Sequence, residues 1–185
     1  MIFVPCTTSL VAYSIIFRSL FANNGLVNYV LVNIGILDKP YNFLTQPFAA
    51  KMVILLGLLW RWTGYNMVFF LSGLQNIEYS VYEAAKIDGA SAIQTFFKIT
   101  VPLLKPTILL TAIMSTNGTL QLFDESVNLT DGGPANASIS MSHYIYNLCF
   151  KYVPNFGYAA AMSFFILLLV AVLAFIQMRV GDKRD

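Results

Sequence analysis

The stretch GYAAAMSFFILLLVAVLAFIQM, residues 157–178, carries no charged side chain. A helix needs about 20 apolar residues to cross the hydrocarbon core of a bilayer, so this stretch is long enough to span a membrane. The whole chain has 185 residues, of which 57% are hydrophobic and 11% charged. A soluble domain has roughly 25% charged residues. The composition therefore indicates that lipid is the solvent for much of this chain.

Three further stretches approach the length of a membrane-spanning helix. They cover residues 1–21, about 49–74 and about 107–123. The first lacks the basic segment that opens a signal peptide, so we expect it to remain in the protein. The last of the three is short and carries polar side chains, so hydropathy supports it least. The sequence thus predicts an all-α, polytopic membrane protein with about four transmembrane helices.

The distribution of Lys and Arg predicts the orientation of these helices. The connection 75–106 and the tail after the last span hold six of these residues, whereas the other two connections hold three. Short cytoplasmic loops carry the excess of Lys and Arg. We therefore expect the 75–106 connection and both termini to lie on the cytoplasmic side.

The 75–106 connection contains two possible capping boxes, in which a serine and a residue three positions later bond each other's backbone amides. Ser80 with Glu83 is one, and Ser91 with Gln94 is the other. These pairs predict two short helices in sequence. Each helix would begin at its serine.

A turn at Asp88-Gly89 separates these helices, because glycine tolerates a left-handed backbone. We expect the second helix to end before Pro102 and to carry a mostly apolar face. That face could rest on the membrane surface while Glu83 only caps a helix, or the unit could dock a cytoplasmic partner. From the residues alone the two readings are about even. The apolar face consists of Ile93, Phe96, Phe97, Thr100 and Val101.

The run EAAKIDGASAIQTFFKITVP (83–102) resembles the EAA loop of ABC-type importer permeases, whose pattern is EAAxxDGAxxxxxFxxIxLP. Val101 stands in place of the pattern's leucine. The stretch LTDGGP (129–134) resembles maltose-type sugar permeases, and the similarity extends over essentially the whole chain. The matching positions are Glu83, Ala84, Ala85, Asp88, Gly89, Ala90, Phe96, Ile99 and Pro102.

This resemblance implies a subunit of a sugar importer in the cytoplasmic (inner) membrane of a bacterium. Two permease subunits would form the channel, an ABC ATPase dimer would drive it, and an extracytoplasmic solute-binding protein would deliver the solute. The chain contains no GxxxxGK[ST] motif, so we expect no enzyme activity and no cofactor here, with ATP bound by the ATPase partners. The resemblance assigns the contact with the ATPase to Glu83, Ala84, Ala85, Asp88, Gly89, Ala90 and Pro102.

The resemblance also predicts one permease domain over residues 1–185, with its coupling loop at about 75–106. Permeases of this family usually have six or more spans, and this chain opens in what corresponds to the third. We therefore expect an N-terminally truncated form that lacks about two spans.

Polar side chains within spans tend to face a cavity or another helix. Tyr65 and Asn66 offer an aromatic face and an amide, which suit a sugar. Asn117, Gln121 and Asp124 are spaced at i, i+4 and i+7, so we expect them on one helix face lining the solute pathway. Hydrogen bonding between helices is an equally good explanation for that spacing.

Arg61 lies well inside the second apolar stretch, with no acid near it in the sequence. A structural role is favoured over a place in the solute pathway by about two to one. Pairing with an acid from another subunit is a further possibility.

Several other classes of function receive little support. The net charge of +2 does not indicate nucleic acid, and one histidine without clustered ligands does not indicate a metal site. An ion-coupled secondary transporter would favour carboxylates near the middle of the bilayer, and no acid occupies the centre of a clear span. That class, and a membrane fragment that transports nothing, remain the alternatives.

Overall fold

The computed structural model describes residues 2–181, and every regular element in that range is a helix. The all-α prediction is confirmed. In chain order the elements are α1 (Val4–Thr7), α2 (Leu10–Leu20), α3 (Leu26–Asn33), α4 (Pro47–Gln75), α5 (Tyr79–Ile87), α6 (Ala92–Thr95), η1 (Phe96–Thr100), α7 (Val101–Leu103), α8 (Lys105–Leu120), η2 (Ser126–Thr130), η3 (Pro134–Asn136), α9 (Met141–Tyr146), η4 (Asn147–Lys151) and α10 (Phe156–Gly181).

Two of these helices, α4 and α10, are long and apolar enough to cross a membrane. A third crossing is possible if Ala92–Leu103 and Lys105–Leu120, which meet at an angle of 65°, are counted as one bent span. Within residues 2–181 the structure therefore provides two spans, or up to three. The predicted number of four is not confirmed.

The first apolar stretch is not one continuous helix, so the prediction of an unbroken span over residues 1–21 is wrong. The chain leaves the helical conformation at Thr8, whose ψ is 148°. Thr7 and Thr8 donate their hydroxyl groups to the carbonyls of Val4 and Pro5, at 2.8 and 2.7 Å. Such local bonds compete with the helix, which explains the break between α1 and α2.

Small residues on one side of α4 let the N-terminal helices approach closely. Ala50, Gly57 and Gly64 are seven positions apart and all buried. The ring of Tyr13 lies over Gly57, and a Cβ atom on Gly64 would overlap the carbonyl of Ile2. The close contact of α1 and α2 with α4 therefore depends on these positions.

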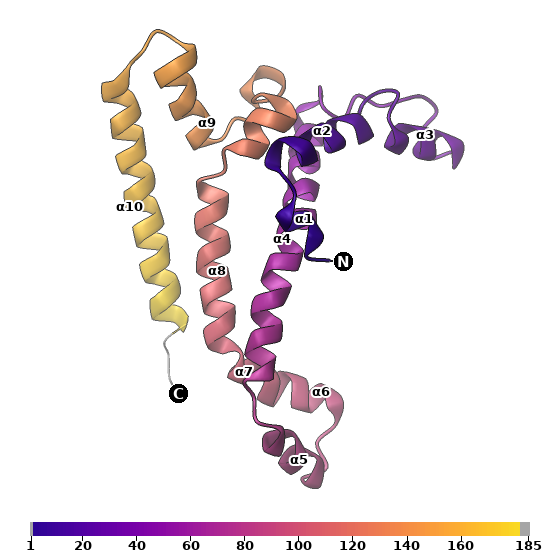
Figure 1. The fold of residues 1–185 in the computed structure, drawn as a ribbon, viewed down its shortest axis with the longest axis vertical. Helices are drawn as coiled ribbons and strands as arrows, with labels where there is room; N and C mark the ends of the chain where they lie inside the picture. The colour runs from indigo at the N-terminus through magenta and orange to yellow at the C-terminus, as the bar shows by residue number, and fades with distance from the viewer. Residues whose placement is uncertain (1, 182–185) are drawn as a thin grey trace.

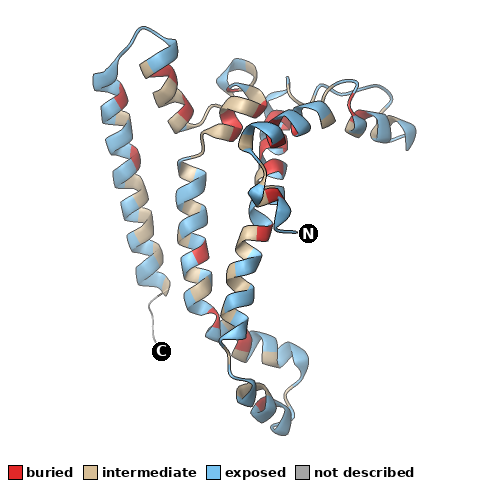
Figure 2. Ribbon diagram, viewed as in Figure 1, coloured by how far each residue is buried: buried red, intermediate tan, exposed pale blue. Residues whose placement is uncertain are grey.

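The helices α4, α8 and α10 run along the long axis of the molecule (Figure 1). The elements α5 and α6 lie at one end, whereas α2, α3 and α9 lie at the other. Buried residues gather where α2 meets α4, and most of α10 is exposed (Figure 2). The buried cluster consists of Tyr13, Phe17, Val53, Ile54 and Leu129.

Candidate functional site

The α5–α7 segment (residues 76–104) lies at the end of the molecule opposite α3 and α9 (Figure 1). Its turn forms because Gly89 has a φ of +72°, a left-handed conformation that glycine adopts without strain. The N–H of Gly89 bonds to the carbonyl of Lys86 at 3.1 Å, and the N–H of Ala90 to that of Ala85 at 2.9 Å. These two bonds form a Schellman motif and close the end of α5. The predicted turn is confirmed.

Of the two predicted capping boxes, only the second is formed. The Ser91 hydroxyl accepts from the N–H of Gln94, whose side chain accepts from the N–H of Ser91. The prediction of a capping box at Ser80 is wrong, because α5 begins at Tyr79 and its N-cap residue is Glu78. The Ser80 hydroxyl donates to the Glu78 carboxylate at 3.2 Å, and Glu83 is exposed.

The second helix continues through Pro102, so the prediction that it ends before this residue is wrong. A proline lacks the N–H that would bond to the preceding turn. The π-helical turn η1 precedes it, and the N–H of Val101 bonds to the carbonyl of Phe96 five positions back. This wider turn brings the proline into the helix. The sharp bend follows at Leu104, between α7 and α8.

The matched positions of this segment differ in exposure. Glu83, Ala84, Asp88 and Gly89 are exposed, whereas Ala85 is buried. Ala90 is half-buried, and Pro102 is exposed.

The apolar side of the segment is largely free. The exposed fractions are 86% for Ile87, 73% for Ile93 and 65% for Phe97. The hydroxyl groups of Tyr82 and Thr100 lie 3.3 Å apart and join α5 to η1. The segment is thus a braced projection that offers an apolar surface, as a docking element requires.

The polar stripe predicted beyond α8 is only partly formed. The side chain of Gln121 donates from Nε2 to the side-chain Oδ1 of Asn117 at 2.7 Å, so these two lie together. However, α8 ends at Leu120, and Gln121 is its C-cap. Asp124 therefore does not continue the same helix face, and that part of the prediction is wrong. The role of the three residues in transport stays a prediction.

Tyr65 and Asn66 lie in α4 and are half-buried. The Tyr65 ring packs edge-to-face against Trp62 and Phe69, with ring centroids 5.4 and 5.0 Å away. No hydrogen bond between described residues links Tyr65 or Asn66 to the polar residues at the end of α8. The five predicted pathway residues thus form two separate groups.

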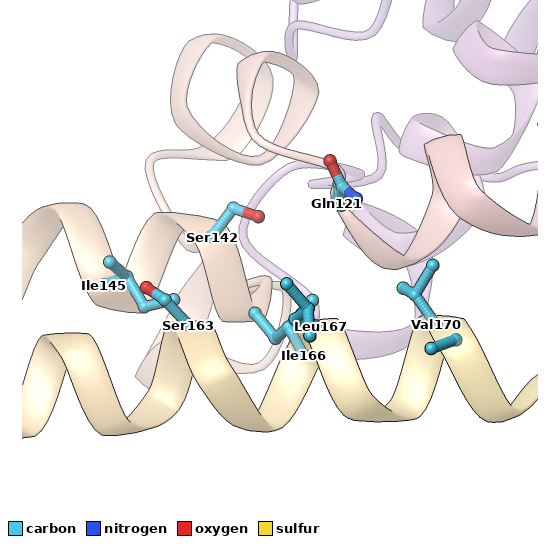
Figure 3. A pocket seen from close by; sticks show the side chains of 8 residues that line it. Gln121, Ser142, Ile145, Ser163, Ile166, Leu167 and Val170 are labelled. Atoms are coloured by element: carbon cyan, nitrogen blue, oxygen red, sulfur yellow. The ribbon is translucent and has the colours of Figure 1, made fainter.

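A groove of about 600 Å³ lies between the end of α8, α9 and α10 (Figure 3). Gln121 lines it, which agrees with a position beside a cavity. Ser142 and Ser163 contribute hydroxyl groups, although most of the lining is apolar. Sequence reasoning did not identify these two serines, because neither belongs to a motif or a polar spacing that would single it out. The apolar lining consists of Ile145, Ile166, Leu167, Val170 and Ala171.

The α8–α10 connection (residues 121–155) contains a buried polar network that the sequence did not indicate. The Ser126 hydroxyl lies 2.9 Å from Nδ1 of His143 and 2.8 Å from the Ser138 carbonyl, to which it donates. Nζ of Lys151 donates to Asp131 at 2.7 Å, and Nε2 of His143 lies 3.8 Å from the same carboxylate. This network ties η2 to α9 and η4.

Two groups in this network, His143 and Asp131, have lowered pKa values. Burial lowers the pKa of His143, although the nearby Asp131 acts in the opposite direction. The hydrogen bond from Lys151 lowers the pKa of Asp131. His143 is thus held neutral, and Asp131 is held ionised.

An all-helical membrane protein with a braced, partly apolar projection at one end and polar groups at the other has the architecture of a transporter subunit. The sequence profile of the family described as "Binding-protein-dependent transport system inner membrane component" matches residues 2–184. The chain belongs to this family.

Relatives in this family are permeases of sugar transport systems. The lactose transport system permease protein LacF of Rhizobium radiobacter is 55% identical, over 100% of this chain and 62% of that protein. The trehalose/maltose transport system permease protein MalF of Thermococcus litoralis is 36% identical, over 86% of this chain and 53% of that protein. The chain therefore spans less than two thirds of the length of these relatives.

Two solved structures share the fold. One is a bacterial ABC transporter involved in the import of the acidic polysaccharide alginate, with a TM-score of 0.87, 24% identity, and coverage of 100% of this chain and 64% of that one. The other is a bacterial alginate ABC transporter in complex with an alginate pentasaccharide-bound periplasmic protein. Its TM-score is 0.77 and its identity 25%, with coverage of 98% and 61%.

Proposed function

We propose that this chain is a permease subunit of an ABC importer that moves a sugar or oligosaccharide across the bacterial cytoplasmic membrane. The α5–α7 segment is the observation that carries the proposal. Its turn is closed by hydrogen bonds at Gly89, it exposes Ile93 and Phe97, and it lies beyond the ends of α4 and α8. Such a projection can transmit the movement of an ATPase to the spans attached to it.

The partners follow from this assignment. An ABC ATPase dimer binds and hydrolyses ATP and receives the α5–α7 segment through Glu83, Asp88, Gly89 and their matched neighbours. A second permease subunit and membrane lipid cover the exposed faces of α4, α8 and α10. An extracytoplasmic solute-binding protein delivers the solute at the opposite end. Residues 1–185 then act as one permease domain, with its coupling loop at 75–106.

The solute pathway lies at the end of the molecule opposite α5–α7. Support comes from the groove beside Gln121 and from the hydrogen-bonded amides of Asn117 and Gln121. Hydroxyl and amide groups next to an apolar wall suit a sugar, which has polar edges and less polar faces. The proposed pathway also includes Asp124, together with Tyr65 and Asn66 further along α4.

The decisive experiment is uptake by proteoliposomes that contain the protein with its ATPase, second permease and binding protein. We expect uptake of radiolabelled lactose or another oligosaccharide that requires internal ATP and is unchanged when the proton gradient is collapsed. Uptake that follows the ion gradient and ignores ATP would instead support a secondary transporter. Absence of uptake for a broad panel of sugars would contradict the choice of solute class.

A labelling experiment tests the orientation. With Cys6 and Cys149 replaced by serine, a cysteine at Ser91 should react with a membrane-impermeant maleimide only after the cytoplasmic face is opened. A cysteine at Ser138 serves as the opposite control and should react in intact spheroplasts. Labelling of the Ser91 position from outside would reverse the proposed topology.

A further inference from the structure

Arg61 is a half-buried cation in the middle of an apolar helix. Its guanidinium carbon lies 5.6 Å from the centre of the Tyr13 ring and 5.9 Å from that of Trp62. Nε and Nη1 of Arg61 are buried and have no hydrogen-bond partner among residues 2–181, and the same holds for the Tyr13 hydroxyl. A charge within a membrane-spanning helix is costly unless an opposite charge or polar groups compensate it.

The fold brings an acid toward this cation that the sequence places 64 positions away. Glu125 directly precedes η2, which packs against both α2 and α4. Leu129 of η2 belongs to the same buried cluster as Tyr13. Only 5% of Glu125 is exposed, so its carboxylate also needs compensation.

The charge of Arg61 also acts on the titration of Glu125, which agrees with this packing. Burial raises the pKa of the Glu125 carboxyl, while a backbone hydrogen bond and the positive charge of Arg61 act in the opposite direction. At the Tyr13 hydroxyl, the charge of Glu125 acts more strongly than that of Arg61, and Asp124 acts least. Glu125 therefore acts more strongly than its neighbour Asp124 at Tyr13, the ring beside which the Arg61 guanidinium lies.

We propose that Glu125 is the counter-ion of Arg61, and that this pair positions η2 and the chain after Gln121 against α4. Arg61 then acts as a positioning residue within one subunit. It contacts neither the solute nor an acid of another subunit. The Tyr13 ring lies beside Arg61 and packs in the same apolar cluster as Leu129 of η2.

This arrangement makes a specific prediction for a double-mutant cycle. Removing one member of a buried pair leaves an uncompensated charge, whereas replacing both by apolar residues is often tolerated. Arg61→Met and Glu125→Met should each reduce maximal uptake at least tenfold and lower the thermal unfolding midpoint in detergent. The double variant should return to within about threefold of the unmodified protein, which shows a strongly non-additive pair.

Matched variants separate pairing from packing. Asp124→Asn removes the neighbouring charge and should show additive effects with Arg61→Met. The reversed pair, Arg61→Glu with Glu125→Arg, should take up solute better than either reversed single variant, which a purely steric role does not predict. The half-saturating solute concentration should change less than twofold in the Arg61 and Glu125 variants.

The proposal is overturned if the fold-loss of uptake in the double variant equals the product of the fold-losses in the two single variants. It also fails if Arg61→Met alone shifts the half-saturating concentration, or if Arg61 couples to Asp124 instead. The uptake readout rests on the proposed function, but the unfolding midpoint does not. If the unmodified protein transports nothing, the cycle of unfolding midpoints still decides whether Arg61 and Glu125 are paired.

Discussion

The α5–α7 segment and the α8–α10 connection are both polar stretches between apolar helices, but different kinds of contact hold them together. In the first, most bonds join near neighbours, such as Ser91 with Gln94 and Ala90 with Ala85. In the second, Ser126 bonds to His143 and Asp131 to Lys151, which are 17 and 20 positions apart. The first segment takes its shape largely from near neighbours, whereas the second depends on bonds between residues far apart in its sequence.

The largest effect should come from Gly89→Val. A side chain in the left-handed conformation costs roughly 1–2 kcal/mol, and at Gly89 it would also change the turn that we assign to ATPase docking. We expect uptake to fall more than tenfold while the ATPase still hydrolyses ATP. Uptake and ATPase rates in the same proteoliposomes measure this separation.

Gly35→Val is the matched control for this experiment. Gly35 has a φ of +75° against +72° for Gly89, and a Cβ atom meets nothing within 4 Å at either position. The two variants should therefore lose similar amounts of stability, but only Gly89→Val should uncouple transport. Equal loss of uptake in both would show that backbone strain alone explains the defect.

Ser126→Ala should have the next largest effect. The loss of stability should extend beyond Ser126 to the elements that its hydroxyl group joins. The hydroxyl of Ser126 is fully buried and contacts three groups: Nδ1 of His143, the carbonyl of Ser138 and the N–H of Ser140. Each buried polar group left unsatisfied costs roughly 1–3 kcal/mol. Hydrogen exchange should rise across η2 and α9 together. A change limited to residues next to Ser126 would contradict this dependence on distant contacts.

Ser91→Ala is the matching substitution in the α5–α7 segment, because the Ser91 hydroxyl, like that of Ser126, accepts a hydrogen bond from a backbone N–H. Here the partner is Gln94, three positions away and exposed to solvent. Loss of an N-cap costs about 1 kcal/mol, so we expect faster exchange only in α6 and η1. Ser91→Asp should restore protection, since aspartate also caps helices. Faster exchange in α5 would show that this segment is less modular than its bonds indicate.

These differences explain how much of the fold followed from the sequence. The spans at α4 and α10, the turn at Gly89 and the cap at Ser91 depend on local composition and spacing, and all were predicted. The pairing of His143 with Ser126 depends on how α9 meets η2, and the approach of Glu125 to Arg61 depends on how η2 packs against α2 and α4. No pattern of neighbouring residues encodes those contacts.

Each incorrect prediction has a local cause, in which a hydrogen bond or a change of helix type overrides the structure that the sequence pattern predicts. Hydrogen bonds from threonine hydroxyl groups interrupt the first apolar stretch after Thr7. The Ser80 hydroxyl, which was expected to cap α5, instead donates a hydrogen bond to the Glu78 carboxylate. The π-helical turn η1 lets the chain pass through Pro102 as a helix. The end of α8 at Leu120 separates Asp124 from Asn117 and Gln121. The residues of the candidate pathway could be listed from sequence, but not their arrangement.

Acidification should weaken the α8–α10 connection modestly and leave the α5–α7 segment unchanged. Burial lowers the pKa of His143 below its usual 6.5, so its contribution to stability is complete above pH 6.5 and is lost as the pH falls through the lowered value. Asp131, whose pKa is also lowered, contributes in the same direction only below about pH 4. Hydrogen exchange of α9 between pH 5 and 7.5 measures the effect. His143→Gln should remove the dependence in this range, and an unchanged slope would assign it to another group.

The smallest effect on stability should come from Glu83, and this residue tests whether the α5–α7 segment does more than fold. Its side chain is exposed and makes no hydrogen bond among residues 2–181, so it does not cap α5. Substitution of an exposed residue that neither caps a helix nor joins a buried network changes the free energy of unfolding by less than about 0.5 kcal/mol. We expect this small change for both Glu83→Ala and Glu83→Gln.

Uptake tests the contact of Glu83 with the ATPase. An exposed ion pair with the ATPase would contribute about 0.2–1 kcal/mol, which corresponds to an uptake loss of roughly 1.5- to 5-fold in both variants at unchanged stability. Recovery in Glu83→Gln alone would show that a hydrogen bond, and not the charge, is what the ATPase recognises. Normal uptake in Glu83→Ala would remove this residue from the docking surface and leave Gly89 and its turn as the part of the segment that couples.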